Sequence, residues 1–294
     1  MSAPAPAALI TPEVRARFDA DGVVKVPGVV GADWIERILA DAQSQLERPG
    51  PWVTDTNPGA SVGRLFTTRY RWETNAAVSD FVRHSPIAPM AAALVGSPSV
   101  RFYFDHLLVK EPHTPDPTPW HQDIGYWPFL GRQIVSAWVP MTAAGVDDSS
   151  LEFVRGSHSW NAYYAPESFD GKAGWAEDFA GEPMPDIAAA RAEPDCPYEI
   201  VGFDVEPGDA IFFSAWTLHW SPGNSGERRR VALSTRWLGE DTTWFPHAGC
   251  DPTVTQDDTT AVPGEYPADD DRFPLIYDAR TDGDAAPAGA PASA

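Results

Sequence analysis

The stretch Pro119-Trp120-His121-Gln122-Asp123 places an imidazole and a carboxylate two residues apart. In an extended strand, side chains at positions i and i+2 point to the same face, so His121 and Asp123 are expected on one surface. A neutral nitrogen and a hard anionic oxygen suit a divalent first-row metal such as iron. A second histidine, His219, lies far downstream. Two histidines and one carboxylate on one side of a metal leave its other positions open for substrates and dioxygen.

Each piece of this pattern also has an ordinary explanation when it is taken alone. A His-x-Asp pair occurs by chance in many chains, and an isolated His219 is more often a core histidine with its hydrogen bonds satisfied. Arg230 follows Arg228 and Arg229 and would fit a surface charge. Strand alternation, however, places Arg230, Ala232 and Ser234 on one face of the strand predicted over residues 229–237. A buried arginine there needs an anionic partner, which a dicarboxylate that also chelates the metal would supply.

Composition narrows the class of protein. The 294 residues carry a net charge of −21, which disfavours nucleic acid and anionic membranes as partners. Only two cysteines are present, Cys196 and Cys250, so a disulfide framework is excluded and a reducing, cytoplasmic location is expected. No apolar run reaches membrane-spanning length, and the first residues do not form a secretory signal.

The elements that must position these residues are helices first and strands afterwards. Helices are predicted over residues 11–20, 32–47 and 86–94, and strands over 23–27, 100–110, 134–141, 149–154, 199–205, 210–220 and 229–237. Residues 49–75 show no clear periodicity and are expected to form a long functional loop, and residues 160–196 an insertion. The ends, 1–10 and 281–294, have the composition of disordered tails. We therefore expect an α+β fold with a β-sandwich or barrel in a single domain, residues 11–280, with its core at about 100–240.

With these pieces in order, the sequence resembles the phytanoyl-CoA dioxygenase family of Fe(II)/2-oxoglutarate-dependent oxygenases. The resemblance covers roughly residues 14–240. It rests on Asp21-Gly22-Val23-Val24-Lys25-Val26-Pro27-Gly28, Trp120-His121-Gln122-Asp123, Ala137-Trp138-Val139-Pro140, Gly156-Ser157-His158, Pro207-Gly208-Asp209, and His219 followed eleven residues on by Arg230. It implies a double-stranded β-helix, a cupin-like jelly roll, flanked by N-terminal helices.

The resemblance also implies a role for each motif. His121, Asp123 and His219 would be the iron ligands, and Arg230 would bind the distal carboxylate of 2-oxoglutarate. Trp138, His106 and Ser234 are expected beside this cosubstrate. Gly156-Ser157-His158 matches a structural signature, and Asp148-Ser149-Ser150 departs from the family's usual Asn-Gly in a turn.

The expected reaction is hydroxylation or another oxidation of a small organic substrate by O2, with release of succinate and CO2. Related halogenases carry a small residue at the position of Asp123, so chlorination is not expected. The alternative is a non-catalytic or 2-oxoglutarate-independent metal-binding protein of cupin type, which would leave Arg230 without a function.

The substrate pocket is less well defined by the sequence. Candidate lining residues, for each of which ordinary packing is an equal alternative, are Arg64, Arg69, Arg71, Trp72, Ile124, Tyr126, Trp127, Phe129, Trp244 and Phe245. Arginines in the 49–75 segment of an acidic chain indicate an anionic group on the substrate. The sequence gives no information on oligomeric state.

Overall fold

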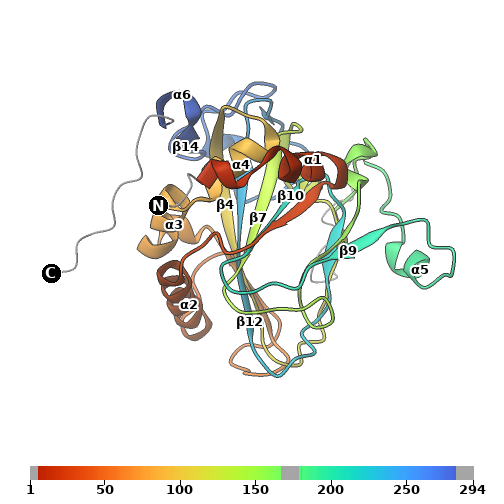
Figure 1. Ribbon diagram of the computed structural model, residues 1–294. Coiled ribbons are helices and arrows are strands. Elements are labelled where there is room, and N and C mark those ends of the chain that lie inside the picture. Colours follow the sequence, from red (N-terminus) through yellow and green to blue (C-terminus); the bar gives the residue numbers. More distant parts are fainter. Residues whose placement is uncertain (1–5, 167–178, 180, 283–294) are drawn as a thin grey trace.

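An eight-stranded antiparallel sheet runs through the middle of the computed structural model, which describes residues 6–166, 179 and 181–282 (Figure 1). Its strand order is β1-β10-β7-β12-β4-β3-β2, and β14 pairs with β4. The strands are β1 Val23–Val26, β2 Val53–Asp55, β3 Leu65–Arg69, β4 Ser99–Lys110, β7 Ile134–Pro140, β10 Ala210–Ser214, β12 Arg230–Leu238 and β14 Leu275–Asp278.

A four-stranded sheet in the order β5-β11-β8-β9 packs on one face of the large sheet. Its strands are β5 Thr118–His121, β8 Glu152–Val154, β9 Ile200–Gly202 and β11 His219–Ser221, and a separate pair joins β6 Phe129–Leu130 to β13 Thr243–Trp244. Phe153 of β8 meets Phe213 of β10 with ring centroids 5.2 Å apart. The small sheet and the large sheet therefore enclose a space between them, and the proposed ligands lie at its edge.

Helices cover the opposite face of the large sheet (Figure 1). They are α1 Pro12–Asp21, α2 Ala32–Glu47, α3 Ala76–His84 and α4 Ile87–Val95, with short helices α5 Ile187–Arg191 and α6 Ala279–Asp282 elsewhere. The Thr11 side chain caps α1 by accepting from the backbone of Val14, and Gly22 ends the helix with φ at 75°. The apolar stripe of α2 supplies Ile38, Ala42 and Leu46 to the core between helices and sheet.

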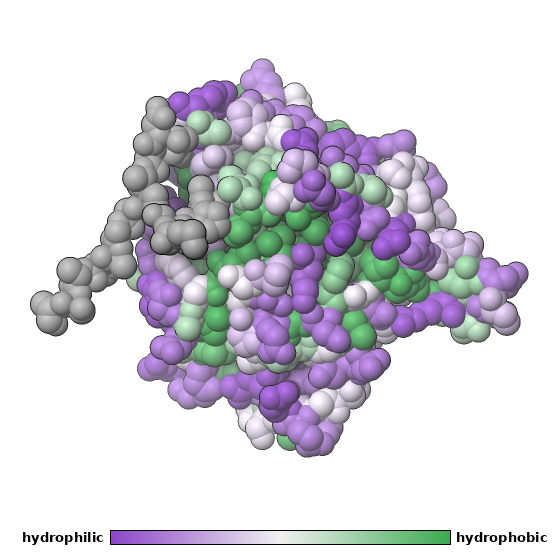
Figure 2. Space-filling model, viewed as in Figure 1, coloured by the Kyte–Doolittle hydropathy of each residue, from purple (hydrophilic) through white to green (hydrophobic). Residues whose placement is uncertain are grey.

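Short 3-10 turns complete the chain, at η1 Pro6–Leu9, η2 Arg71–Glu73, η3 Asp123–Tyr126, η4 Ser157–Ser159 and η5 Gln256–Asp258. Hydrophilic residues cover most of the periphery of the face drawn in Figure 2, while hydrophobic ones gather toward its middle. Within the described ranges, no helix is both long enough and apolar enough to cross a membrane.

The α+β class and the helix over residues 32–47 agree with the predictions, but two predicted segments differ. Residues 49–75 are not an aperiodic loop, because β2 and β3 within them extend the large sheet at its β4 edge. The strand predicted over 210–220 is broken: β10 ends at Ser214 and β11 begins at His219, in the other sheet. Alternation of side chains therefore cannot be counted from Ile211 through to His219.

The chain ends agree only in part with the expected tails. Residues 6–9 form η1, and Leu9 and Ile10 pack on the helical core, because burying two large apolar side chains stabilises this short segment. Residues 1–5 and 283–294 lie outside the described residues, as do 167–178 and 180 of the predicted insertion.

Candidate metal centre and cosubstrate cavity

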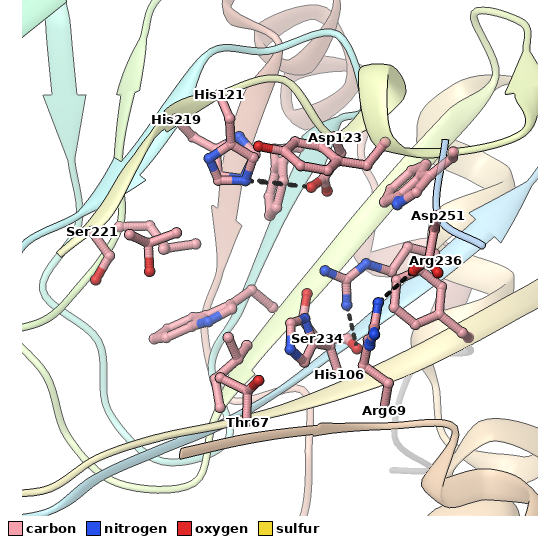
Figure 3. A pocket seen from close by; sticks show the side chains of 18 of the residues that line it. Thr67, Arg69, His106, His121, Asp123, His219, Ser221, Ser234, Arg236 and Asp251 are labelled. Atoms are coloured by element: carbon pink, nitrogen blue, oxygen red, sulfur yellow. Dashed lines mark hydrogen bonds and ion pairs between the residues drawn. The ribbon is translucent and has the colours of Figure 1, made fainter. Parts of the chain in front are cut away.

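His121, Asp123 and His219 lie together at the edge of the small sheet (Figure 3). Their ligand atoms all lie within 4.8 Å of one another, and all three residues are buried. His121 and His219 are direct cross-strand partners in the β5–β11 pair. The Nε2 atoms of His121 and His219 lie 3.6 and 3.9 Å from Oδ1 of Asp123. This is the only cluster of three such side chains found in the part of the chain that the structure describes.

The backbone sets the orientation of both imidazoles. Nδ1 of His121 donates to the carbonyl oxygen of Pro119 at 2.8 Å, and Nδ1 of His219 donates to that of Thr217 at 3.0 Å. With the proton on Nδ1, each Nε2 presents its lone pair to the point where a metal would sit. Burial and the neighbouring His121 lower the pKa of His219 to about 3, so its ring is neutral near pH 7.

Asp123 presents one carboxylate oxygen to the two imidazoles. Gln122 has extended backbone, with φ −105° and ψ 138°, so the i and i+2 side chains share a face although β5 ends at His121 and Asp123 begins η3. Oδ2 of Asp123 accepts a hydrogen bond of 2.7 Å from Oγ of Ser136 on β7, and Oδ1 of Asp123 faces the histidines. Burial opposes ionisation, but the nearby His121, His219 and Arg236 outweigh it and hold the pKa of Asp123 well below its usual range.

The turn at residues 215–218 carries His219 to the site and is fixed by several hydrogen bonds. The Gln122 side chain donates to the carbonyl oxygen of Trp216 at 2.8 Å, and the Ile124 amide donates to that of Ala215 at 2.9 Å. Oγ of Ser157 accepts from the Leu218 amide at 2.9 Å. Ser157, in the Gly156-Ser157-His158 signature, thus supports the turn.

A cavity of about 220 Å³ opens beside the three candidate ligands. Among its lining residues are His106, Tyr126, Trp127, Trp138, Arg230 and Ser234. Arg230 is only 3% exposed, and its guanidinium lies 5.7 Å from the centroid of the Trp138 ring. Its Nη1 donates to the carbonyl oxygen of Leu108 at 3.2 Å, while Nε has no hydrogen-bond partner. No carboxylate of the described residues pairs with it, so this cation is available to an anionic ligand.

A second buried basic residue, Lys110, lies across the sheet from Arg230. Lys110, on β4 directly opposite Arg230, donates to Oγ of Ser221 at 3.3 Å and to the carbonyl oxygen of Pro222. Burial, and secondarily the charge of Arg230, lowers the pKa of Lys110. Burial likewise lowers the pKa of Arg230 to about 10, which leaves it charged at neutral pH.

The predicted pocket residues divide into two groups. Arg69, Tyr126 and Trp127 line the cavity, as do His106 and Ser234, whose Nε2 and Oγ atoms are buried without partners. Arg64 and Phe129 do not line it. Arg64 is held by Asp55 in an ion pair of 2.7 Å, and Phe129 packs on Trp244 in a separate aromatic core.

Among the less specific candidates, Ile124, Arg71, Trp72, Trp244 and Phe245 also lie outside the cavity lining. Arg71 pairs with Asp41 at 2.6 Å, and Trp72, Ile124 and Trp244 belong to the hydrophobic cores. Among the lining residues that were not predicted, two are charged, Arg236 and Asp251.

Most of this chain matches a known protein family. A model of the phytanoyl-CoA dioxygenase (PhyH) family matches residues 18–232. This chain belongs to the phytanoyl-CoA dioxygenase family. It is thus a non-haem enzyme that uses Fe(II), 2-oxoglutarate and O2.

Individual relatives of this dioxygenase are distant. A methylphosphonate hydroxylase of Gimesia maris is 22% identical over 224 residues, which are 74% of this chain and 76% of that protein. A probable phytanoyl-CoA dioxygenase of Caenorhabditis elegans is 24% identical over 169 residues, 55% of this chain and 51% of the relative. The chain therefore spans about half the length of the second relative.

Solved structures share the fold of the dioxygenase over nearly its whole length. The α-ketoglutarate-dependent epimerase SnoN from nogalamycin biosynthesis has 26% identity and a TM-score of 0.68, with 92% of this chain and 96% of SnoN covered. The carbocyclase SnoK of the same biosynthesis has 24% identity and a TM-score of 0.70, with 94% of this chain and all of SnoK covered (100%). SnoN has also been solved with Fe3+, α-ketoglutarate and nogalamycin RO.

The residues of this dioxygenase fit the iron and cosubstrate that the family uses. Two imidazole nitrogens and one carboxylate oxygen converge from β5, η3 and β11, and each is oriented by a further hydrogen bond. The unpartnered Nε of Arg230 meets the requirement of a dicarboxylate for a buried counter-charge.

Proposed function

We propose that His121, Asp123 and His219 hold Fe(II), and that Arg230 binds the distal carboxylate of 2-oxoglutarate, for hydroxylation of a small organic substrate. The observation that carries the proposal is the buried, unpaired Arg230 in the same cavity as the three ligands. Iron and 2-oxoglutarate, when bound, supply the oxidation, in which O2 is consumed and succinate and CO2 are released.

The chain's own residues bind and orient in this proposal. The Trp138 ring, 5.7 Å from the Arg230 guanidinium, would help to exclude water from it, and Ser234 and His106 would offer a hydroxyl and a ring nitrogen to the cosubstrate. Burial first, then the charges of Arg236 and Arg69, lowers the pKa of His106, so it would act as a neutral ring. Tyr126, Trp127 and Arg69 are left to contact the primary substrate.

The proposal places these groups in one catalytic domain, residues 11–280, whose two sheets we assign to a double-stranded β-helix centred on about 100–240. The free thiols Cys196 and Cys250 and the acidic net charge favour a cytoplasmic enzyme acting on small molecules rather than on nucleic acid or membranes. The alternative, a metal-binding protein that does not use 2-oxoglutarate, gives no reason to bury Arg230 without a counter-ion.

The test is succinate release by the Fe(II)-loaded protein with 2-oxoglutarate under air, alone and with a panel of small organic compounds. We expect slow release alone, faster release with a true substrate, and loss of both in Asp123→Ala. Metal binding without any 2-oxoglutarate consumption would favour the alternative.

A further inference from the structure

Farther along β12 than Arg230, a second buried arginine faces the same cavity. Arg236 is 6% exposed and lines the cavity, and its guanidinium stacks on Phe104, with 4.5 Å to the ring centroid. Its Nη1 donates to the carbonyl oxygen of Ser234 at 2.8 Å, whereas Nε is buried without a partner. Stacking leaves the edge of the guanidinium, where its donors lie, available to a ligand.

Arg69 on β3 reaches the same end of the cavity from the opposite side of β4 (Figure 3). Its Nη1 pairs with Oδ2 of Asp251 at 2.5 Å. Oδ1 of Asp251 is taken by the amide and hydroxyl of Thr253, so both carboxylate oxygens are engaged. Asp251 thus fixes one side of the Arg69 guanidinium and leaves its other donors facing the cavity.

Among the described residues, no carboxylate forms an ion pair with Arg236. The carboxylates that act on Arg236 are Asp123, the proposed iron ligand, and Asp105. Asp105 already accepts from the amides of Arg71 and Trp72, and burial raises its pKa to about 6. Asp251 is thus engaged by Arg69 and Thr253, and the buried Nε of Arg236 remains without a hydrogen-bond partner and available to an anionic ligand.

Arg230 and Arg236 are placed to serve different ligands. They lie six residues apart on one strand, which separates their Cα atoms by roughly 20 Å at about 3.3 Å per residue. Arg230 lies opposite Lys110, whereas Arg236 lies opposite Ser136, the residue that holds Asp123. A five-carbon cosubstrate anchored at Arg230 leaves the Arg236 end of the cavity to the second substrate.

We propose that Arg236 and Arg69 form a binding subsite for an oxyanion group, a carboxylate or phosphonate, on the primary substrate. The inference rests on the proposed function, since it takes the iron and Arg230 sites as given. The two arginines would anchor the charged end of the substrate and so select which carbon faces the metal.

The test uses anaerobic Fe(II)-loaded protein saturated with 2-oxoglutarate at fixed ionic strength. Butanoate and methylphosphonate are titrated against their neutral counterparts butanamide and dimethyl methylphosphonate, with calorimetry as the readout. We expect one or both anions to bind at least about tenfold more tightly than the neutral partner, and this preference to be lost in Arg236→Gln and in Arg69→Gln. Arg228→Gln, an exposed arginine on the same chain segment, is the matched control and should keep the preference.

Three results would overturn the proposal. The first is that the native protein binds neither anion in preference to its neutral partner. The second is that the preference survives both substitutions. The third is that Arg236→Gln loses affinity for 2-oxoglutarate, which would assign Arg236 to the cosubstrate. If Arg236→Gln does not fold, Arg69→Gln supplies the same comparison. Succinate release without a second substrate reports separately on the iron site. If the native protein released no succinate, the proposed function itself would be refuted.

Discussion

Replacing Arg230 by alanine should weaken 2-oxoglutarate binding strongly without removing the metal site. The guanidinium is 3% exposed, carries an unpartnered Nε and has no carboxylate partner among the described residues. Loss of one partner of a desolvated, charge-assisted pair costs about 2–5 kcal/mol. At about 1.4 kcal/mol per tenfold, the apparent Kd for 2-oxoglutarate should rise by about 30-fold or more.

Nearby groups should not compensate for this loss. Lys110 is committed to Ser221 and Pro222, so its ammonium is not free to replace the guanidinium. Arg230→Lys should recover only part of the affinity, because an ammonium cannot form the paired hydrogen bonds of a guanidinium. Arg228→Ala is the control, since Arg228 is exposed two residues before Arg230, at the end of the 222–227 loop.

The assay is anaerobic calorimetry of 2-oxoglutarate binding to Fe(II)-loaded protein, with Fe(II) affinity measured separately. Arg230→Ala should bind Fe(II) as the native protein does. If Arg228→Ala lost 2-oxoglutarate and Arg230→Ala retained it, the register assigned to β12 would be wrong.

Three further predictions concern the support of the ligands and the outcome of the reaction. Ser136→Ala removes the hydrogen bond to Oδ2 of Asp123 and should lower Fe(II) affinity by about 10- to 100-fold, measured by competition with a chelator. The exposed control Ser225→Ala should leave the affinity unchanged, and equal affinities in the two variants would exclude this role for Ser136. Gln122→Leu removes the side-chain donor to the Trp216 and Ala162 carbonyls and should reduce the free energy of unfolding by about 1–3 kcal/mol in denaturant titrations. The exposed control Gln43→Ala should cost about 0.5 kcal/mol or less. An unchanged midpoint for Gln122→Leu would show that other contacts hold the 215–218 turn. Native enzyme turning over in chloride buffer should give oxidised product without chlorine by mass spectrometry, because position 123 carries a carboxylate where related halogenases carry a small residue. A chlorinated product would contradict the assignment of Asp123 as a ligand.

The clustering of the three candidate metal ligands was predictable from the sequence because the first two, His121 and Asp123, are close in the chain. The His121 and Asp123 spacing holds as long as Gln122 is extended, which it is even though the regular strand stops at His121. The third ligand was predicted by motif order, but the strand proposed to carry it is wrong. Ala215, Trp216 and Leu218 are apolar and buried in the turn, so no Gly or Pro marks the change from β10 to β11.

The cavity was less predictable, for reasons that differ between residues. Arg236 shares the alternation of Arg230, Ala232 and Ser234, so the signal for it was present in the sequence. Asp251 follows the last strand of the core, and only tertiary contact with Arg69 reveals its place. Arg64 and Arg71 carry the same charge as Arg69, yet Asp55 and Asp41 bind them elsewhere, which residue type cannot distinguish.

The β2–β3 pair was not predicted from the sequence because of the residues that flank its strands. Proline and glycine residues before β2 and between β2 and β3 suggested a loop, although Leu65–Arg69 is rich in residues that favour strands. Pairing with β4 decides the outcome, and it places Thr67 and Arg69 on the cavity wall.

The most direct test of the account is anaerobic titration of Fe(II) into native protein and into His219→Ala in the presence of 2-oxoglutarate. The native protein should bind one Fe(II) per chain and develop the visible charge-transfer band of iron chelated by a 2-oxo acid. His219→Ala should show neither stoichiometric binding nor the band, because it removes one of three converging ligands. Native-like binding and a native-like band in His219→Ala would contradict the assigned metal centre.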